Sequence, residues 1–335
     1  MNPLLDLVRV PLIKRLIVGI VVPVADVVLV PLTIFSALLL KLIRRVGVYR
    51  MRISKMVLEM VGVFPIRDHY YEPMFNPRHL RRSLREDRML PGIDFNERGQ
   101  LELLERFRFG EELKGFPREK RGELEYYYNN PNFGPGDAEF LHGLIRLYKP
   151  STILEIGSGM STLMARNAVA ANRRDDPSYR CRHVCIEPYE MPWLGDVDGV
   201  EVLRKPVGDI DRRKFAELGK NDILFIDSSH VIRPQGDVVV EYLEILPTLR
   251  PGVLVHIHDI FTPKDYPDEW VLEQVRFWNE QYLVEAFLSF NGGFRILAAL
   301  NYLRHHFPEK LAEKCPVLAE TIARCEPGSL WLVRV

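Results

Sequence analysis

The chain has 335 residues, of which 47% are hydrophobic and 27% charged, and these proportions exclude a disordered, collagen-like or coiled-coil protein. Lys+Arg and Asp+Glu number 45 each, so the molecule as a whole is not a polycation built to bind nucleic acid. The charge is uneven, however, because residues 1–55 hold nine basic side chains against two acidic ones. A basic, apolar head favours contact with a membrane surface over contact with nucleic acid.

The N-terminal segment carries the strongest hydropathy signal. Within residues 16–40 the only ionisable side chain is Asp26. A helix of that length would be about 37 Å long, enough to cross a hydrocarbon core of ~30 Å. Pro23 and Pro31 interrupt the helical pattern, Asp26 would lie near the bilayer centre, and both flanks are basic. These features favour a re-entrant insertion, so we expect residues 10–48 to attach the protein to the cytoplasmic face of a membrane. The alternative is a buried helical pair that packs on the globular domain.

The rest of the chain divides by composition. We expect residues 1–50 to form the membrane-associated segment, 51–125 a connecting region of short helices and loops, and 126–335 a catalytic domain. The basic run at 78–85 is either a solvated helix face or a contact with lipid headgroups. The four cysteines do not make a disulfide framework or a zinc site, so we expect reduced and mostly buried thiols in a cytoplasmic protein.

From about residue 126 short apolar runs alternate with helical stretches. Strands are predicted at residues 152–156, 183–187, 200–203, 222–227 and 252–258. This alternation predicts an α/β fold with a parallel sheet and helices on both faces. Ligands of such sheets bind outside the carboxyl ends of the strands, so the residues at those ends are the candidates for function.

A glycine pair at the end of the first predicted strand indicates a cofactor. Gly157 and Gly159 open a helix directly after the strand, and Glu187 ends the next strand, where a carboxylate can accept hydrogen bonds from both ribose hydroxyls. Thr162 stands where a dinucleotide-binding motif has its third glycine, and Glu187 comes later than that motif expects. The pattern therefore favours an adenosine-containing cofactor without a pyrophosphate.

The stretch Glu-Ile-Gly-Ser-Gly-Met-Ser-Thr at 155–162 resembles motif I of the class I S-adenosylmethionine-dependent methyltransferases, in the branch of macrocin-type O-methyltransferases. Residues 222–230, 249–259 and 328–334 resemble later motifs of that branch. The resemblance covers about residues 126–335. It implies a Rossmann-like methyltransferase fold, a mostly parallel seven-stranded sheet with helices on both faces, to which the helical N-terminal extension is added.

The resemblance also implies roles for individual residues. Glu155 would orient the glycine loop and face the cationic end of the cofactor, Glu187 would hold the ribose, and Gly208 and Asp209 would approach the adenine. For Asp209 the alternative is an N-cap of the following helix. The full set of implied S-adenosylmethionine-binding residues is Glu155, Gly157, Ser158, Gly159, Glu187, Gly208 and Asp209.

Three further residues bear on catalysis. Asp227 and Asp259 stand at adjacent strand ends, where two carboxylates could share a Mg²⁺ ion, and His230 would be the general base that takes the acceptor's proton. In metal-dependent macrocin-like enzymes the corresponding residues do these jobs. This chain has Ile260 where catechol-type relatives have Asn after the second Asp, so the sequence does not decide whether a metal is bound. The alternative is that Asp227 and His230 form a hydrogen-bonded pair that shapes the loop.

The predicted function is a membrane-associated S-adenosylmethionine-dependent methyltransferase. The acceptor would be a hydroxylated small molecule, a glycan or a lipid-linked sugar, with no nucleic-acid partner, and an oligomer is possible. Residues 126–133, rich in aromatic and amide side chains, would form either a lid over the cofactor or acceptor, or a packing strap. Two other classes stay open at this point: an Fe(II)-dependent hydroxylase of the same fold branch, and a non-catalytic membrane adaptor.

Overall fold

The computed structural model describes residues 17–74, 76–189 and 191–335. Two compact units divide the chain, one ending at Arg81 and the other running from Arg82 to Val335. This division differs from the predicted boundaries at 50 and 125, because the helices at 97–104 and 110–114 bury Leu103, Leu104 and Leu113 in the main core of the second unit.

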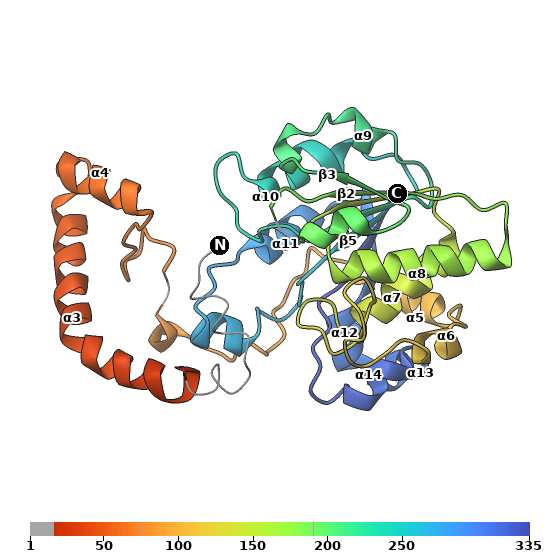
Figure 1. Ribbon diagram of the computed structural model, residues 1–335, viewed down its shortest axis with the longest axis horizontal. Coiled ribbons are helices and arrows are strands. Elements are labelled where there is room, and N and C mark those ends of the chain that lie inside the picture. Colours follow the sequence, from red (N-terminus) through yellow and green to blue (C-terminus); the bar gives the residue numbers. More distant parts are fainter. Residues whose placement is uncertain (1–16, 75, 190) are drawn as a thin grey trace. The chain divides into compact units, whose positions relative to one another are not determined.

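The first unit consists of helices and loops. Its elements are η1 (Ile17–Val21), α3 (Val22–Val46), α4 (Arg52–Val61) and η2 (Pro77–His79). Pro31 lies inside α3 without ending it, and Figure 1 shows the α3 ribbon bending partway along its length, as expected where a proline removes a backbone donor. The described part of the segment is therefore one bent helix and not a helical pair.

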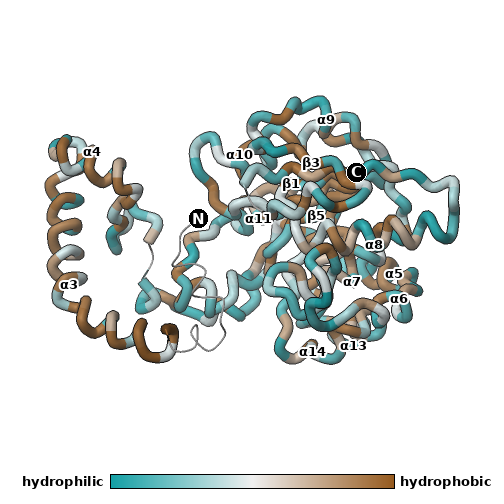
Figure 2. Tube along the Cα trace, viewed as in Figure 1, coloured by the Kyte–Doolittle hydropathy of each residue, from teal (hydrophilic) through white to brown (hydrophobic). Residues whose placement is uncertain are grey.

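Helix α3 is apolar and exposed. It buries only Ile43. An 18-residue window within Ile17–Val46 has a mean hydropathy of 2.5, and none of its residues is buried. Figure 2 shows this apolar character along most of the helix. A small apolar cluster of Ile43, Val48 and Leu58 joins the end of α3 to α4. The segment satisfies the length and composition of a membrane span, which a signal sequence would also do.

The second unit contains a seven-stranded sheet. Its strands are β1 (Thr152–Ile156), β2 (Arg182–Ile186), β3 (Val200–Leu203), β4 (Ile223–Ile226), β5 (Leu254–Ile257), β6 (Phe294–Ala299) and β7 (Leu330–Arg334). The strand order is β3-β2-β1-β4-β5-β7-β6, and β7 runs antiparallel to both of its neighbours while the first five strands are parallel. The predicted mostly parallel seven-stranded sheet is confirmed, and the predicted strand limits hold to within two residues.

Helices cover both faces of this sheet (Figure 1). Alternate strand residues point to opposite faces, so Ile153 belongs to one core and Leu154 to the other. The remaining elements of the unit are α5 (Glu97–Leu104), α6 (Gly110–Lys114), α7 (Asp137–Tyr148), α8 (Met160–Asp175), η3 (Pro192–Asp196), η4 (Val207–Asp209), α9 (Arg213–Ala216), α10 (Asp237–Val240), η5 (Glu241–Ile245), η6 (Leu246–Thr248), η7 (Glu269–Glu273), α11 (Glu280–Leu288), α12 (Leu300–His306), α13 (Pro308–Lys314) and α14 (Pro316–Thr321). The four cysteines are free, and three of them are buried.

Candidate active site

The site lies at the carboxyl ends of β1, β2, β4 and β5, where a cavity of about 840 Å³ opens. This is the position that a doubly wound parallel sheet reserves for ligands. The predicted site residues that line the cavity are Gly157, Ser158, Gly159, Glu187, Asp227, His230 and Asp259. Gly208, Asp209 and Glu155 are not among the described residues that line it.

The turn after β1 requires glycine at its first position. Gly157 has a φ of +76°, and a Cβ there would lie 1.7 Å from the carbonyl oxygen of Asp227. No other residue fits, because the end of β1 is pressed against the backbone that leaves β4. The turn brings Gly159 and the first residues of α8 to the wall of the cavity.

Glu155 lies behind this turn. Its carboxylate is completely buried, accepts a hydrogen bond from the Thr162 hydroxyl at 2.6 Å and lies 2.8 Å from His183 Nε2. Thr162 in turn accepts the N–H of Gly159 at 3.2 Å. Glu155 therefore supports the glycine turn from below, and its oxygens do not face the cavity as the resemblance implied.

Glu187 is fixed at the cavity wall by backbone donors. One carboxylate oxygen accepts the N–H of Ser158 at 3.3 Å and the other accepts the N–H of Tyr189 at 3.1 Å. A carboxylate oxygen can accept more than one hydrogen bond, and the two hydroxyls of a ribose are donors. An acceptor of this kind at this wall fits the hydroxyl groups of an adenosine ribose.

Gly208 and Asp209 form the short helix η4 after β3, and both are exposed. Asp209 does not cap the next helix α9, whose N-cap position is occupied by Arg212. Their proposed contact with adenine stays a prediction.

The catalytic candidates come together beside the glycine turn, at the ends of β4 and β5. Asp227, His230 and Asp259 each direct one possible ligand atom into a cluster whose atoms lie within 4.8 Å of one another. His230 Nε2 is 3.3 Å from Asp227 Oδ1 and 3.7 Å from Asp259 Oδ2. His230 and Asp259 have φ values of +59° and +57°, a left-handed conformation that costs free energy in residues other than glycine. The sequence predicted this grouping of the three side chains.

Glu280 is a member of this cluster that sequence reasoning missed. Its Oε2 lies 2.8 Å from His230 Nδ1 and its Oε1 accepts the Tyr242 hydroxyl at 2.9 Å, and its side chain is fully buried. Glu280 opens α11, 50 residues after His230, so no local motif announces it. The bond to Nδ1 leaves Nε2 pointing toward the two aspartates.

These contacts set the protonation of the cluster. Burial alone would lower the pKa of His230, but hydrogen bonds to Asp227 and Glu280 and the charge of Asp259 raise it well above its usual value. Burial would raise the pKa of Asp227, yet the charges of His258 and His230 hold it at about 2. Burial raises the pKa of Asp259. The site therefore holds a positive charge at neutral pH, as a proton on His230 or as a cation in its place.

The donor set fits a divalent cation. The carboxylates of Asp227 and Asp259 lie close together, and oxygen ligands of this kind suit Mg²⁺, while His230 Nε2 beside them keeps its lone pair for a proton. His256, by contrast, stacks on Phe225 with ring centroids 4.0 Å apart and lies 2.8 Å from Ser329 Oγ, so it is a residue of the sheet interior.

The cavity has further walls, two of which come from loops. Asn130 and Phe133 from the aromatic–amide segment line it, whereas Tyr126 and Tyr128 of the same segment are fully buried. The segment thus combines a packing strap with part of the wall. The loop between β5 and α11 contributes Trp270, Arg276 and Trp278, for which the sequence carried no recognisable signal.

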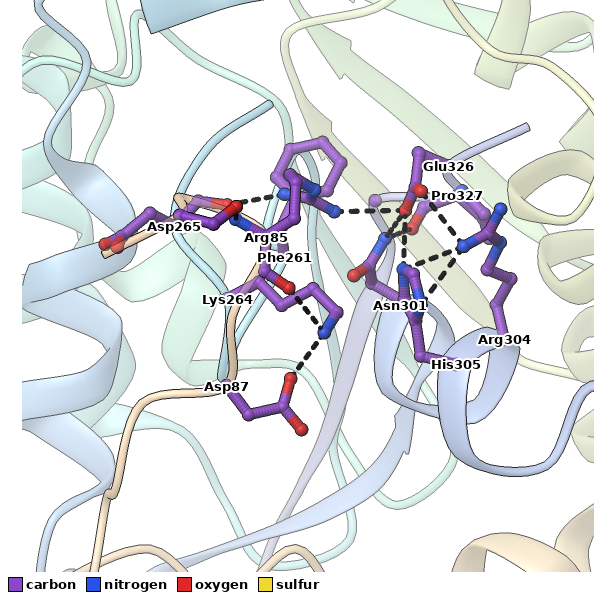
Figure 3. A network of polar contacts seen from close by, with 12 residues as sticks. Arg85, Asp87, Phe261, Lys264, Asp265, Asn301, Arg304, His305, Glu326 and Pro327 are labelled. Atoms are coloured by element: carbon purple, nitrogen blue, oxygen red, sulfur yellow. Dashed lines mark hydrogen bonds and ion pairs between the residues drawn. The ribbon is translucent and has the colours of Figure 1, made fainter. Parts of the chain in front are cut away.

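A charged network holds the cavity wall together (Figure 3). Glu326, which lines the cavity, accepts hydrogen bonds from Asn301 at 2.7 Å and Arg85 at 3.1 Å and pairs with Arg304 at 3.0 Å. Arg85 also donates to the carbonyl of Asp265 at 2.8 Å. Arg85 belongs to the basic run at 78–85, so this arginine serves an internal contact and not a solvated face.

Comparison with known proteins agrees with this geometry. The family model described as a methyltransferase domain matches residues 154–260, which include the glycine turn and the three catalytic candidates. An uncharacterized protein of Archaeoglobus fulgidus is 32% identical over 177 residues, covering 49% of this chain and 78% of the archaeal one.

Similar solved structures include two O-methyltransferases, one from Bacillus cereus in complex with S-adenosylhomocysteine and one from Streptomyces achromogenes, involved in tomaymycin synthesis, in complex with S-adenosylmethionine. The Bacillus cereus enzyme is 14% identical to this chain, with a TM-score of 0.36, and the match covers 70% of this chain and 91% of that one. The Streptomyces achromogenes enzyme is also 14% identical, with a TM-score of 0.38, and the match covers 69% of this chain and 98% of that one. A putative O-methyltransferase from Klebsiella pneumoniae is 15% identical, with a TM-score of 0.33, covering 70% of this chain and 89% of that one. The matched methyltransferase domain and the strand order of the sheet identify the chain as a methyltransferase with the Rossmann-like class I fold.

Proposed function

We propose that this methyltransferase transfers the methyl group to a hydroxyl oxygen of a glycan, a lipid-linked sugar or another hydroxylated acceptor at a membrane surface. The observation that carries the proposal is the cluster of Asp227, His230 and Asp259, which shares one cavity with the glycine turn and Glu187. A proton-accepting group beside the cofactor site is what transfer to a hydroxyl requires, since the acceptor must lose its proton as it attacks.

Cofactor binding in this proposal follows from the fixed groups of the wall. Glu187 holds the ribose hydroxyls, and the backbone of Gly157, Ser158 and Gly159 passes along the amino-acid part. Glu155 acts on the cofactor indirectly, because its hydrogen bond with Thr162 keeps the glycine turn in place. A cofactor held in this way would share the cavity with Asp227, His230 and Asp259.

The chemical step is an in-line displacement. The acceptor oxygen forms a bond to the methyl carbon, the carbon–sulfur bond breaks, and S-adenosylhomocysteine leaves with the bonding electron pair on sulfur. The hydroxyl proton passes to His230 Nε2, whose orientation is held by Glu280 at Nδ1. A divalent cation held by Asp227 and Asp259 would neutralise the two carboxylates, lower the pKa of His230 into the range of a useful base and polarise the acceptor hydroxyl.

The metal is tested with the full-length protein, labelled S-adenosylmethionine and a panel of hydroxylated sugars. We expect activity to be lost on chelation and restored by Mg²⁺ or Mn²⁺. Asp259→Asn is expected to need a much higher metal concentration, because an amide is a poorer ligand than a carboxylate. Activity that survives exhaustive chelation in both proteins would remove the metal from the proposal and leave Asp227 and His230 as a metal-free pair.

We also propose that the first unit attaches the enzyme to the cytoplasmic face of a membrane. Along α3 the apolar side chains are exposed, and the end of the helix carries Arg44 and Arg45. Helix α4 is amphipathic, with an apolar arc that is exposed while Leu58 on another side packs in the small cluster with α3. The exposed residues of that arc are Ile53, Met56, Val57, Met60 and Val61. An exposed apolar helix followed by an amphipathic helix with basic flanks suits a leaflet rich in anionic lipid.

A further inference from the structure

The loop between β5 and α11 builds an aromatic–cationic feature that the methyl-transfer chemistry does not use. The Arg276 guanidinium lies 4.4 Å from the ring centroids of both Trp270 and Trp278. All three residues line the cavity and are partly exposed. We call these three residues the Trp–Arg–Trp clamp.

Arg276 in this clamp has no carboxylate partner among the described residues. Its guanidinium contacts the two indole rings, and its backbone N–H donates to the carbonyl of Trp270 at 2.9 Å. The acidic side chains of the same wall are engaged elsewhere. Glu269 accepts the side-chain amide of Gln274 at 2.7 Å, and Glu326 pairs with Arg304 and His305.

A guanidinium stacked on aromatic rings keeps its N–H donors at its edge. Aromatic faces restrict the side chain and exclude water from its flat sides, so the edge donors are oriented in advance for a planar or tetrahedral anion. Arginine forms paired hydrogen bonds with carboxylate and phosphate oxygens, and these charge-assisted bonds are among the strong ones. An unpaired arginine of this kind at a cavity wall has the chemistry of an anion-binding subsite.

The clamp lies next to the catalytic cluster. Trp278 contacts both groups, because its ring centroid is 4.3 Å from that of His230 and its ring lies under the Arg276 guanidinium. A single indole therefore connects the group that takes the proton to the group that would bind an anion. An acceptor that spans the two carries its reacting hydroxyl and its anionic group within about the length of one sugar residue.

We propose that the Trp–Arg–Trp clamp binds an anionic substituent of the methyl acceptor, so that the acceptor class is a sugar or similar polyol that carries a phosphate or a carboxylate. This inference rests on the proposed transfer to a hydroxyl and narrows its substrate. The Trp270 and Trp278 faces also suit the apolar faces of a sugar ring, so the clamp offers both stacking and charge recognition.

The test uses the full-length protein saturated with S-adenosylhomocysteine in the presence of Mg²⁺. Three probes are titrated, glucose 1-phosphate, glucuronate and glucose, and binding is followed by tryptophan fluorescence and by calorimetry. We expect at least one anionic sugar to bind about 10- to 100-fold more tightly than glucose, the range given by a charge-assisted hydrogen-bonding group. Which of the two binds more tightly identifies phosphate or carboxylate as the natural group.

Arg276→Ala is expected to abolish the preference for the anionic sugar, and Arg276→Lys to keep part of it because the charge remains. Arg121→Ala is the matched control, because Arg121 is exposed, lies outside the cavity lining and makes no side-chain hydrogen bond or ion pair with the described residues. Affinity for S-adenosylhomocysteine is measured in every variant, so that loss of the cofactor site is separated from loss of the clamp. Equal binding of all three sugars up to about 10 mM, or a preference that Arg276→Ala retains, overturns the inference while leaving the proposed function in place.

Discussion

Individual side chains in this enzyme are held in place by buried partners, some of them distant in the sequence. His230 is oriented by Glu280, and the glycine turn is held by Glu155 through Thr162. Buried hydrogen-bonded groups of this kind act on the residue that meets the substrate, and their loss is felt at that residue.

Glu280→Gln is the first variant that tests this arrangement. We expect kcat to fall by about 10- to 100-fold, because the partner of His230 Nδ1 changes and the ring loses its fixed orientation. The KM for S-adenosylmethionine should stay unchanged, since the described side-chain contacts of Glu280 are with His230 and Tyr242 and not with the glycine turn or Glu187. Glu273→Gln, at an exposed position of the neighbouring helix η7, is the control. A parallel loss of kcat and of S-adenosylhomocysteine affinity would indicate a general disturbance of the fold.

Glu326 makes stability depend on pH. Burial would raise its pKa, but hydrogen bonds from His305 and Asn301 and the charges of His305 and Arg304 lower it from 4.5 to about 2. The folded state therefore favours the ionised form, and this stabilisation is complete above pH 4.5 and is lost as the pH falls toward 2.

We expect Glu326→Gln to lower the free energy of unfolding at pH 7 by about 1–3 kcal/mol, a range that allows for partial solvent exposure of the side chain. The difference between variant and wild type should shrink between pH 4.5 and 2. Thermal and denaturant unfolding in detergent, followed by tryptophan fluorescence across that range, gives the comparison. A difference that is constant with pH would show that the carboxylate's charge does not stabilise the network of Figure 3.

At the scale of elements, local sequence patterns predicted the strands and helices that depend on short stretches of sequence. The first five strands and the helix after the glycine turn are set by apolar runs and by Gly157, so the sequence located them well. The strand ends then gathered Asp227, His230 and Asp259, because parallel strands end at one edge of the sheet. Glu280 and the Trp–Arg–Trp clamp could not be predicted, since their places depend on how the loop after β5 folds over the cavity.

The course of the N-terminal helix α3 was also not predicted correctly from local sequence. Two prolines in the sequence favoured a broken, hairpin-like insertion, yet α3 continues through Pro31 with a bend. A proline removes one hydrogen bond and bends a helix, and the remaining bonds of a long helix suffice to continue it.

Val28→Arg combined with Leu32→Arg tests whether α3 inserts into lipid. These exposed residues lie four apart on one side of the helix. Each arginine near the centre of a membrane segment costs about 2.5–3.5 kcal/mol on insertion scales, so we expect the double variant to be released from membranes of the expressing cell and to stop floating with anionic vesicles. Tyr70→Arg, at a highly exposed position outside the helices, is the control. A double variant that floats as well as wild type would contradict membrane insertion of α3.

At the scale of the whole molecule, the proposed cofactor site, proton-accepting cluster and acceptor subsite share one cavity at the carboxyl ends of the strands. The cofactor site is the part on which the others depend, because the methyl group must be presented before an acceptor or a metal matters. The assignment of this site depends most on Glu187, a single carboxylate that accepts hydrogen bonds from the N–H groups of Ser158 and Tyr189.

Calorimetric titration of the full-length, detergent-solubilised protein with S-adenosylhomocysteine tests this claim most directly. We predict one binding site per chain, and an affinity that Glu187→Ala lowers by about 1.5–3 kcal/mol, or roughly 10- to 100-fold, through loss of a charge-assisted hydrogen-bonding group. Binding of equal strength in wild type and variant would contradict the ribose assignment, and absence of binding to the wild type would contradict the account as a whole.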